Sequence, residues 1–367
     1  MDYVVAMLLM GEEEEEEEER NMNKERQNNL NLIRRRLRDT QNPFDIPDSS
    51  FLKLYRLPKV ATQQLIEELI NFMPVPKRTT AIPQNLQIFA TLYFLASGSY
   101  QRKVGQDFLS CMSQTSISVF IHATINAFNR IMGQWIKFPT SDRRKQQIKE
   151  KFFEKTGFPG VIGAIDGSHI AIFPSQTERE YLFINRKLYH SLNVMLVSSY
   201  SNEILAVNAM HGRRTHDSRV FRSSRLFHHL ERQQEAGERG SWLIGDSAYP
   251  LMPFLLKPIL NAPMGSPEFR YTQHITTARC AVERCIGILK GRWRCLRKER
   301  ALHYQPEFAA HIVNACCVLH NIAVKWRIPP NEIYLEDIDQ EAPIPCNDVN
   351  ENDAEQIRRN IVRWYFE

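Results

Sequence analysis

The apolar segments that follow Pro159 constrain the fold of this chain more than any other feature. There, Val, Leu and Ile gather in compact blocks such as Leu192–Ser199 and Ile204–Met210, which the dipeptide Ser201-Asn202 separates. Blocks of this length and composition predict β-strands joined by a tight turn. Because strands must bury their apolar faces against other elements, the chain needs further strands and covering helices to complete a core.

Further blocks of the same kind occur before and after this predicted hairpin. Residues 161–165 and 242–245 are short apolar runs, and 255–259 is a candidate fifth strand. Helical periodicity is found at 217–230, 276–294 and 306–325. Strands interleaved with helices predict an α/β fold, with a mixed sheet and helices on both faces.

The region before the sheet, residues 49–155, has helical periodicity. A helix, a short helix and a polar segment at Ser113-Gln114 precede a longer apolar-faced helix. This order is typical of a helix-turn-helix, in which Ser113 is the N-cap and the polar first turn meets DNA. A plain helical bundle would give the same pattern, so both interpretations stay open.

The two ends of the chain differ from its body in charge. Glu12–Glu19 is an unbroken run of eight acids, whereas residues 21–330 hold 43 Lys and Arg against 23 Asp and Glu, a net charge of about +20. We predict a disordered segment at 1–48 and an acidic flexible tail at 329–367. The basic body suggests a polyanion such as nucleic acid, although an enzyme rich in Lys and Arg would look alike. The acidic ends are either solvated or cover the basic surface.

Cysteine content and apolar run lengths indicate the compartment. The seven cysteines include no CxxC pair, which favours reduced thiols buried on helices over a disulfide framework or a zinc site formed by Cys316, Cys317, His311 and His320. No signal peptide is recognised, and no run is long enough to span a bilayer. We therefore expect a soluble protein of the nucleus or cytoplasm. The basic stretch Arg34–Arg38 is a nuclear localisation signal, an arm that contacts DNA, or a plain solvated segment.

Three carboxylates carry the strongest functional signal. Asp166 and Asp246 each end an apolar strand, and Glu283 lies on a helix between apolar neighbours. A buried carboxylate needs a partner, and the hard cations Mg²⁺ and Mn²⁺ prefer such ligands. Alternatively, Asp246 caps a turn and Glu283 pairs with Arg279 or Arg284. Together the three acids predict a two-metal site.

The sequence around these acids resembles the PIF/Harbinger family of DDE transposases and the nucleases derived from them. The similar stretches are Gly163–His169, Ile244–Pro250, Ala281–Gly287, Phe94–Gln101 and Ala315–Ile322. The resemblance covers residues 50–325 and implies an RNase H-like catalytic domain at 156–328. It also implies a catalytic triad of Asp166, Asp246 and Glu283, two Mg²⁺ or Mn²⁺ ions, and a separate Myb/SANT-like DNA-binding partner. His216-Asp217-Ser218 resembles a family position where Asp217 joins the metal site, but a helix N-cap explains it equally well.

Taken together, these patterns predict a metal-dependent DNA endonuclease that hydrolyses phosphodiester bonds. The resemblance to transposases implies a second step, in which the new 3′-hydroxyl attacks target DNA. A homo-oligomer is compatible with this function. A catalytically silent DNA-binding or partner-binding protein is the alternative. A serine hydrolase centred on Ser247 is disfavoured because the chain has no G-x-S-x-G elbow. Predicted phosphate contacts are Arg284, Lys290, Arg292, Arg294, Arg297, Lys298 and Arg300, with Arg143, Arg144 and Lys145 extending the path and Trp293 either stacked on a base or in the core.

Overall fold

The computed structural model describes residues 2–78, 80–107, 109–173, 183–184, 189–212, 217–330, 333–334 and 351–367. The helices are α1 (Asp2–Asp39), α2 (Asp48–Tyr55), α3 (Lys59–Ile70), α4 (Gln84–Ser97), α5 (Gln101–Gln106), α6 (Gln114–Trp135), α7 (Asp142–Thr156), α8 (Asp217–Arg222), α9 (Arg225–Glu235), α10 (Pro267–Arg292), α11 (Pro306–Lys325) and α12 (Glu351–Tyr365). The strands are β1 (Val161–Ala171), β2 (Ser191–Ser198), β3 (Ile204–Gly212), β4 (Trp242–Ile244) and β5 (Leu255–Leu256). Short 3-10 helices are η1 (Pro43–Asp45), η3 (Arg294–Leu296) and η4 (Lys298–Arg300).

The five strands form one mixed sheet in the order β3-β2-β1-β4-β5. Neighbours β1–β2 and β2–β3 are antiparallel, whereas β1–β4 and β4–β5 are parallel. The predicted α/β class is therefore confirmed, and the arrangement is consistent with an RNase H-like fold. Two details differ from our expectation: β1 continues without a break through Ala171, and β5 is only two residues long.

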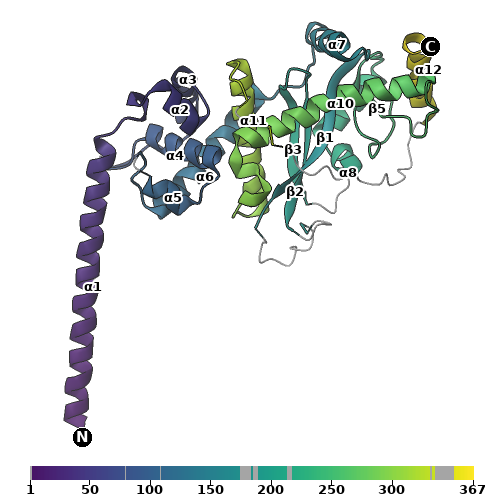
Figure 1. Cartoon of the computed structure of the whole chain (residues 1–367). Helices are drawn as coiled ribbons and strands as arrows, with labels where there is room; N and C mark the ends of the chain where they lie inside the picture. Colours follow the sequence, from purple (N-terminus) through teal and green to yellow (C-terminus); the bar gives the residue numbers. More distant parts are fainter. Residues whose placement is uncertain are drawn as a thin grey trace.

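The helical region and the sheet share a core. Helix α11 lies between α6 and the sheet (Figure 1), and its side chains are buried on nearly every face. One hydrophobic cluster contains buried residues of helices α2 through α6 and of α11. It also contains sheet residues such as Leu192 and Leu196. A second cluster lies among β1, β4, α7, α9, α12 and the first half of α10. Although α11 is apolar enough to cross a membrane, its burial here is typical of a core helix.

The predicted helix-turn-helix outline corresponds to α4, α5 and α6. Ser113 is the N-cap of α6, and its hydroxyl accepts a hydrogen bond from the Ser116 backbone N–H at 3.1 Å. Gln114, the first residue of the helix, is exposed. The predicted cap is thus confirmed, while contact of this turn with DNA stays a prediction.

The N-terminal segment is helical where we expected disorder within 1–48. Helix α1 extends away from the rest of the molecule (Figure 1), and its side chains from residue 16 onward are mostly exposed. Its sequence is rich in Glu, Arg, Asn and Leu, of which all but Asn favour helix without tertiary contacts. The i,i+4 ion pairs Arg20–Glu16 and Arg35–Asp39 add a small further stabilisation.

The C-terminal tail, expected to be flexible over 329–367, also ends in a helix. Helix α12 packs on the first half of α10, at the end of the molecule opposite α1 (Figure 1). Ala354, Ile361, Val362 and Phe366 are buried there. These residues lie near helical spacing, a pattern hidden by the acidic composition of the preceding segment. Of residues 331–350, the structure describes only 333 and 334.

None of the cysteines that the structure describes forms a disulfide, and Cys285, Cys295, Cys316 and Cys317 are buried. Burial lowers the pKa of neighbouring His320 to about 4, so its ring is neutral at pH 7. These residues pack as core side chains of α10, α11 and η3. Their burial agrees with the interpretation that these cysteines are buried helical side chains.

Candidate active site: three carboxylates around one arginine

The register of two parallel strands brings Asp166 and Asp246 to the same level of the sheet. Ala164 of β1 is paired with Ile244 of β4, and each aspartate lies two residues farther along its chain. Neighbouring strands are separated by about 4.8 Å, so the two carboxylates leave the sheet from adjacent positions. Gly245, the residue before Asp246, is tightly enclosed: a Cβ there would lie 2.9 Å from the Tyr249 ring.

Helix α10 supplies the third acid together with a basic partner. Ser266 caps the helix and Pro267 begins it, and its middle packs across β1. Arg279 and Glu283 are four residues apart and therefore face the same side. An Nη2 to Oε1 distance of 2.6 Å joins them, and Arg279 Nη1 lies 3.2 Å from Asp166 Oδ2. One guanidinium thus links an acid of the helix to an acid of the sheet.

The site is accessible but sheltered. The side chains of Asp166, Arg279 and Glu283 are 17%, 19% and 33% exposed. Burial raises the pKa of Asp246, and Glu283 adds to this, against the opposing effects of Arg279 and of backbone N–H groups of Ala248 and Tyr249. The Ala248 N–H donates to Asp246 Oδ1 at 3.0 Å, so Asp246 also stabilises the turn after β4.

All three carboxylates act on Arg279 electrostatically. Burial lowers the pKa of this guanidinium, but Asp166, Glu283 and Asp246 together more than reverse the effect, and its pKa is raised overall. Arg279 is therefore the positive charge that balances the acids in this conformation. The sequence suggested Arg279 only as a partner of Glu283, and its contact with Asp166 was missed because it depends on how α10 crosses β1.

The donor chemistry fits a divalent cation, although the site is closed around the guanidinium. Carboxylate oxygens are the preferred protein ligands of Mg²⁺ and Mn²⁺. Within the described ranges, no group of three or more acids, histidines or cysteines is assembled closely enough to hold a metal ion. The backbone of Asp217 begins α8, but its side chain and all of His216 lie outside the described residues. Its predicted role therefore stays a prediction.

Two of the predicted phosphate contacts are wrong. Lys290 and Arg292 are each 1% exposed, because the end of α10 lies inside the protein. Lys290 donates to the His169 carbonyl at 2.9 Å, and Arg292 donates to the carbonyl groups of Ile328 and Pro329. Their charges are used to satisfy buried backbone oxygens, and no phosphate can reach them.

The remaining basic residues divide into structural and exposed groups. Arg284 is half-buried, donates to Asn202 and Tyr200, and lies 4.9 Å from the Tyr200 ring centre. Lys145 is buried and paired with Glu238, so it does not extend a DNA path. Trp293 is a fully buried core residue, which was one of its two interpretations. Arg294, Lys298 and Arg300 are exposed, as are Arg143 and Arg144, the latter paired with Glu203.

Comparison with known proteins agrees with this architecture. Residues 165–321 match the family described as DDE superfamily endonuclease, a span that contains all three acids. The chain belongs to this superfamily of endonucleases. It is 33% identical over 340 residues to "Putative nuclease HARBI1" of Homo sapiens, covering 88% of this chain and 92% of that protein. The Xenopus laevis protein of the same name is 30% identical over 325 residues, with the same coverage.

More distant relatives occur in plants. "Protein ALP1-like" of Arabidopsis thaliana is 24% identical over 253 residues, covering 65% of this chain and 60% of that protein. No solved structure matches the chain. The relatedness to the HARBI1 proteins extends well beyond the matched nuclease segment, so the helical region belongs to the shared architecture.

Proposed function

We propose that this chain is a metal-dependent DNA endonuclease of the DDE transposase type. Asp166, Asp246 and Glu283 are its metal ligands, and Mg²⁺ or Mn²⁺ is its cofactor. The observation that carries the proposal is the convergence of three acids on a single cation, Arg279. Asp166 lies within β1, Asp246 follows β4 by two residues, and Glu283 lies on α10. Membership of the DDE endonuclease superfamily agrees with it.

When bound, a pair of divalent ions supplies a hydroxide near neutral pH and stabilises the oxygen that leaves phosphorus. The chain's own residues prepare this chemistry. Asp166 and Asp246 are held by the sheet, whereas Glu283, which is more exposed than Asp166, closes the site from α10. Arg279 must release both acids before they coordinate metal, and its guanidinium is then free to bind a phosphate oxygen.

The reaction is hydrolysis of a phosphodiester bond. Water adds to phosphorus, the bond from phosphorus to the 3′ oxygen breaks, and the products are a 5′-phosphate and a 3′-hydroxyl. We propose that the same site is able to activate this hydroxyl for strand transfer, as the likeness to transposases implies. We place the protein in the nucleus, bound to DNA through Arg294, Lys298, Arg300 and the first turn of α6. A Myb/SANT-like partner and a homo-oligomer are compatible with this proposal.

The test is nicking of supercoiled plasmid by the purified full chain in Mg²⁺ or Mn²⁺, with EDTA as the metal-free reaction. Asp246→Asn removes one proposed ligand with little change in shape. Asp353→Asn makes the same substitution at an exposed position of α12 and is the matched control. We expect metal-dependent nicking by the wild type and the control, and a loss of at least about a hundredfold in Asp246→Asn.

Nicking that persists in Asp246→Asn would refute the assignment of the site. Binding of DNA without nicking in either metal would favour the second candidate, a catalytically silent DNA-binding or partner-binding protein. The specific observation for that candidate is again Arg279, since an arginine that satisfies the acids permanently would stabilise the fold without catalysis.

A further inference from the structure

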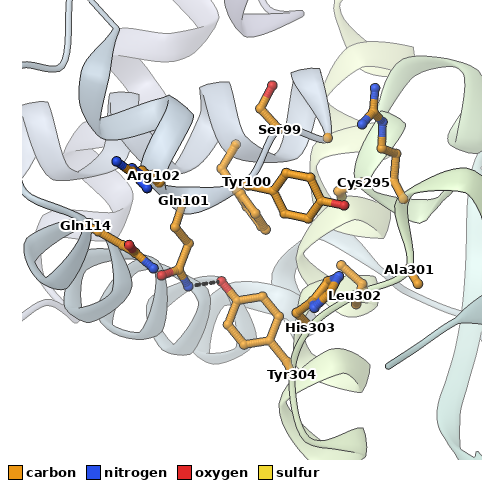
Figure 2. A pocket seen from close by; sticks show the side chains of 13 residues that line it. Ser99, Tyr100, Gln101, Arg102, Gln114, Cys295, Ala301, Leu302, His303 and Tyr304 are labelled. Carbon is orange, nitrogen blue, oxygen red and sulfur yellow. Dashed lines mark hydrogen bonds between the residues drawn. The ribbon is translucent and has the colours of Figure 1, made fainter. Parts of the chain in front are cut away.

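A second hollow lies away from the three acids, between the helical region and the segment that follows η4. It is a cavity of about 310 Å³, lined by the turn from α4 into α5, the start of α6 and residues 300–304 (Figure 2). Small-molecule sites in proteins begin at about this size. The cavity therefore suits one planar ring system rather than an extended ligand.

Aromatic side chains form one side of this pocket. The Tyr100 ring is 62% exposed and meets the His303 ring at 5.5 Å and 75°. His303 stacks in turn on Phe173, at 4.5 Å and 20°. An exposed aromatic face offers a platform on which another flat ring can stack.

Polar groups of the pocket are suited to reading the edge of such a ring. Gln101 Nε2 donates to the Tyr304 hydroxyl at 2.7 Å, which fixes the amide (Figure 2). Burial raises the pKa of Tyr304 to about 12, so this hydroxyl stays protonated. Gln114 lines the same cavity and is exposed. Each glutamine amide carries both donors and an acceptor, as nucleobase edges do.

The charge of the pocket favours an anionic ligand. Arg102 and Arg300 line it and both are exposed, and none of its lining residues is acidic. Aromatic platforms flanked by arginine are the features that proteins use to bind single-stranded nucleic acid, in which bases stack and phosphates pair with guanidinium groups. A neutral apolar ligand would leave these arginines without a role.

The pocket is fixed to the strand that carries Asp166. Gly98 ends α4 at φ +64°, and a Cβ there would come within 3.0 Å of the Arg294 backbone, so only glycine allows this close approach. On the other wall, Leu302 N–H donates to the Ala171 carbonyl at 2.9 Å. Ala171 is five residues beyond Asp166 on β1, which corresponds to about 17 Å along the strand.

We infer that this pocket binds one unpaired nucleobase of the DNA substrate, stacked on Tyr100, with its edge read by Gln101 and Gln114. The inference rests on the proposed function, because the DNA must also reach the three acids. Bases in one strand are spaced by about 3.4 Å, so a strand running straight from Asp166 to the pocket places this base about five nucleotides from the cut. Extruding one base so close to the scissile bond would fix which bond is cut.

The test is binding of the full chain to a short duplex that contains a single bulged 2-aminopurine, compared with the fully paired duplex, in EDTA. Fluorescence of 2-aminopurine reports stacking, and anisotropy of an end label reports total binding. We expect the bulged duplex to bind about tenfold more tightly, from the usual effect of one base–aromatic stack. Tyr100→Ala and Gln114→Ala should reduce this preference, and Tyr100→Phe should keep it. Tyr365→Ala, at a similarly exposed tyrosine of α12, is the matched control.

Both changed positions are exposed, so these variants are expected to fold, and circular dichroism checks this. Equal binding of the two duplexes by the wild type, or an unchanged preference in Tyr100→Ala, would overturn the pocket and leave the proposed endonuclease intact. Failure to bind either duplex at low salt would instead contradict DNA as the substrate, and with it both proposals.

Discussion

Arg279 holds together a cluster of charges that would otherwise repel each other. Its Nη1 atom contacts Asp166 and its Nη2 atom contacts Glu283, and Asp246 adds a third negative charge nearby. A divalent ion would meet the same acids, so arginine and metal compete for one set of oxygens. This competition makes the stability of the protein a direct measure of metal binding.

We predict that Arg279→Gln destabilises the metal-free protein and strengthens its response to metal. Removing one partner of a largely buried ion pair costs about 2–4 kcal/mol, because the acids stay buried without a counter-charge. Thermal unfolding in EDTA should show the loss, and millimolar Mn²⁺ should raise the Tm of the variant more than that of the wild type. The control is Arg284→Gln. Arg284 lies five residues after Arg279 on α10, but it donates to Tyr200 and Asn202. An equal response to Mn²⁺ in all three proteins would contradict the idea.

Asp246, a proposed metal ligand, is held at the expense of stability. Burial raises the pKa of its carboxyl above the value in the unfolded chain, so the folded state disfavours the ionised form. The resulting destabilisation is complete above the raised pKa, diminishes as pH falls through it, and vanishes below the unfolded pKa. At neutral pH the ionised carboxylate therefore opposes folding in the absence of metal.

Asp246→Asn should consequently raise the Tm of the metal-free protein at pH 7 while abolishing nicking. The amide oxygen is still able to accept the Ala248 N–H, so the turn is preserved. The gain in Tm should shrink toward pH 4, as wild-type Asp246 becomes protonated, and this is measurable by calorimetry in EDTA. A variant that is less stable than the wild type at pH 7 would show that Arg279 outweighs burial.

At the scale of elements, the sequence was most informative where a local pattern decides the structure. The apolar blocks before both acids were correctly predicted as strands, and strand register brings Asp166 and Asp246 together. The predicted strand end at Asp166 was wrong, because β1 continues past it to Ala171. Ser113 was recognisable as a cap because a cap needs only its own next turn. Glu283 could be placed on a helix, but not against the sheet, since its direction depends on how α10 crosses β1.

Elements were mispredicted where tertiary contacts or composition override a local pattern. Lys290 and Arg292 lie in a basic stretch that looks solvated, yet the chain returns over them and buries both. The tail around α12 is acidic overall, and this average concealed the buried face that contains Ile361 and Phe366. In helix α1, by contrast, the local helix propensity of the residues is enough to predict a helix. Its side chains from residue 16 onward are mostly exposed, so tertiary contacts add little there.

The packing of α12 gives a prediction about stability. Phe366 is 6% exposed, its ring lies 6.0 Å from those of Phe158 and Tyr271, and its carbonyl accepts a hydrogen bond from Arg270. Phe366→Ala should destabilise the protein by about 3 kcal/mol through lost burial and the cavity left behind. Urea unfolding measures this, and Tyr365→Ala, at the 53% exposed last residue of α12, should change stability by less than about 1 kcal/mol. Equal effects of the two changes would mean that α12 is not docked in solution.

For the whole molecule, the distribution of charge is the feature that bears most directly on the proposed binding of DNA. The body between residues 21 and 330 carries about +20, whereas Glu12–Glu19 lies on α1, which projects from one end. A straight α1 keeps this stretch of the helix apart from the body of the molecule (Figure 1). If the helix bends or a second molecule approaches, the acids compete with phosphates for the same arginines.

Replacing all eight glutamates by alanine tests this competition without weakening the helix, since alanine has the highest helix propensity. We predict that the variant binds a nonspecific duplex about tenfold more tightly at 50 mM salt. The difference should largely disappear near 500 mM, because ions then screen charges beyond about 4 Å. Anisotropy titrations over this salt series measure both affinities and their slopes. If the two proteins bind alike at 50 mM salt, the glutamates are simply solvated, and nonspecific binding is limited by the basic body alone.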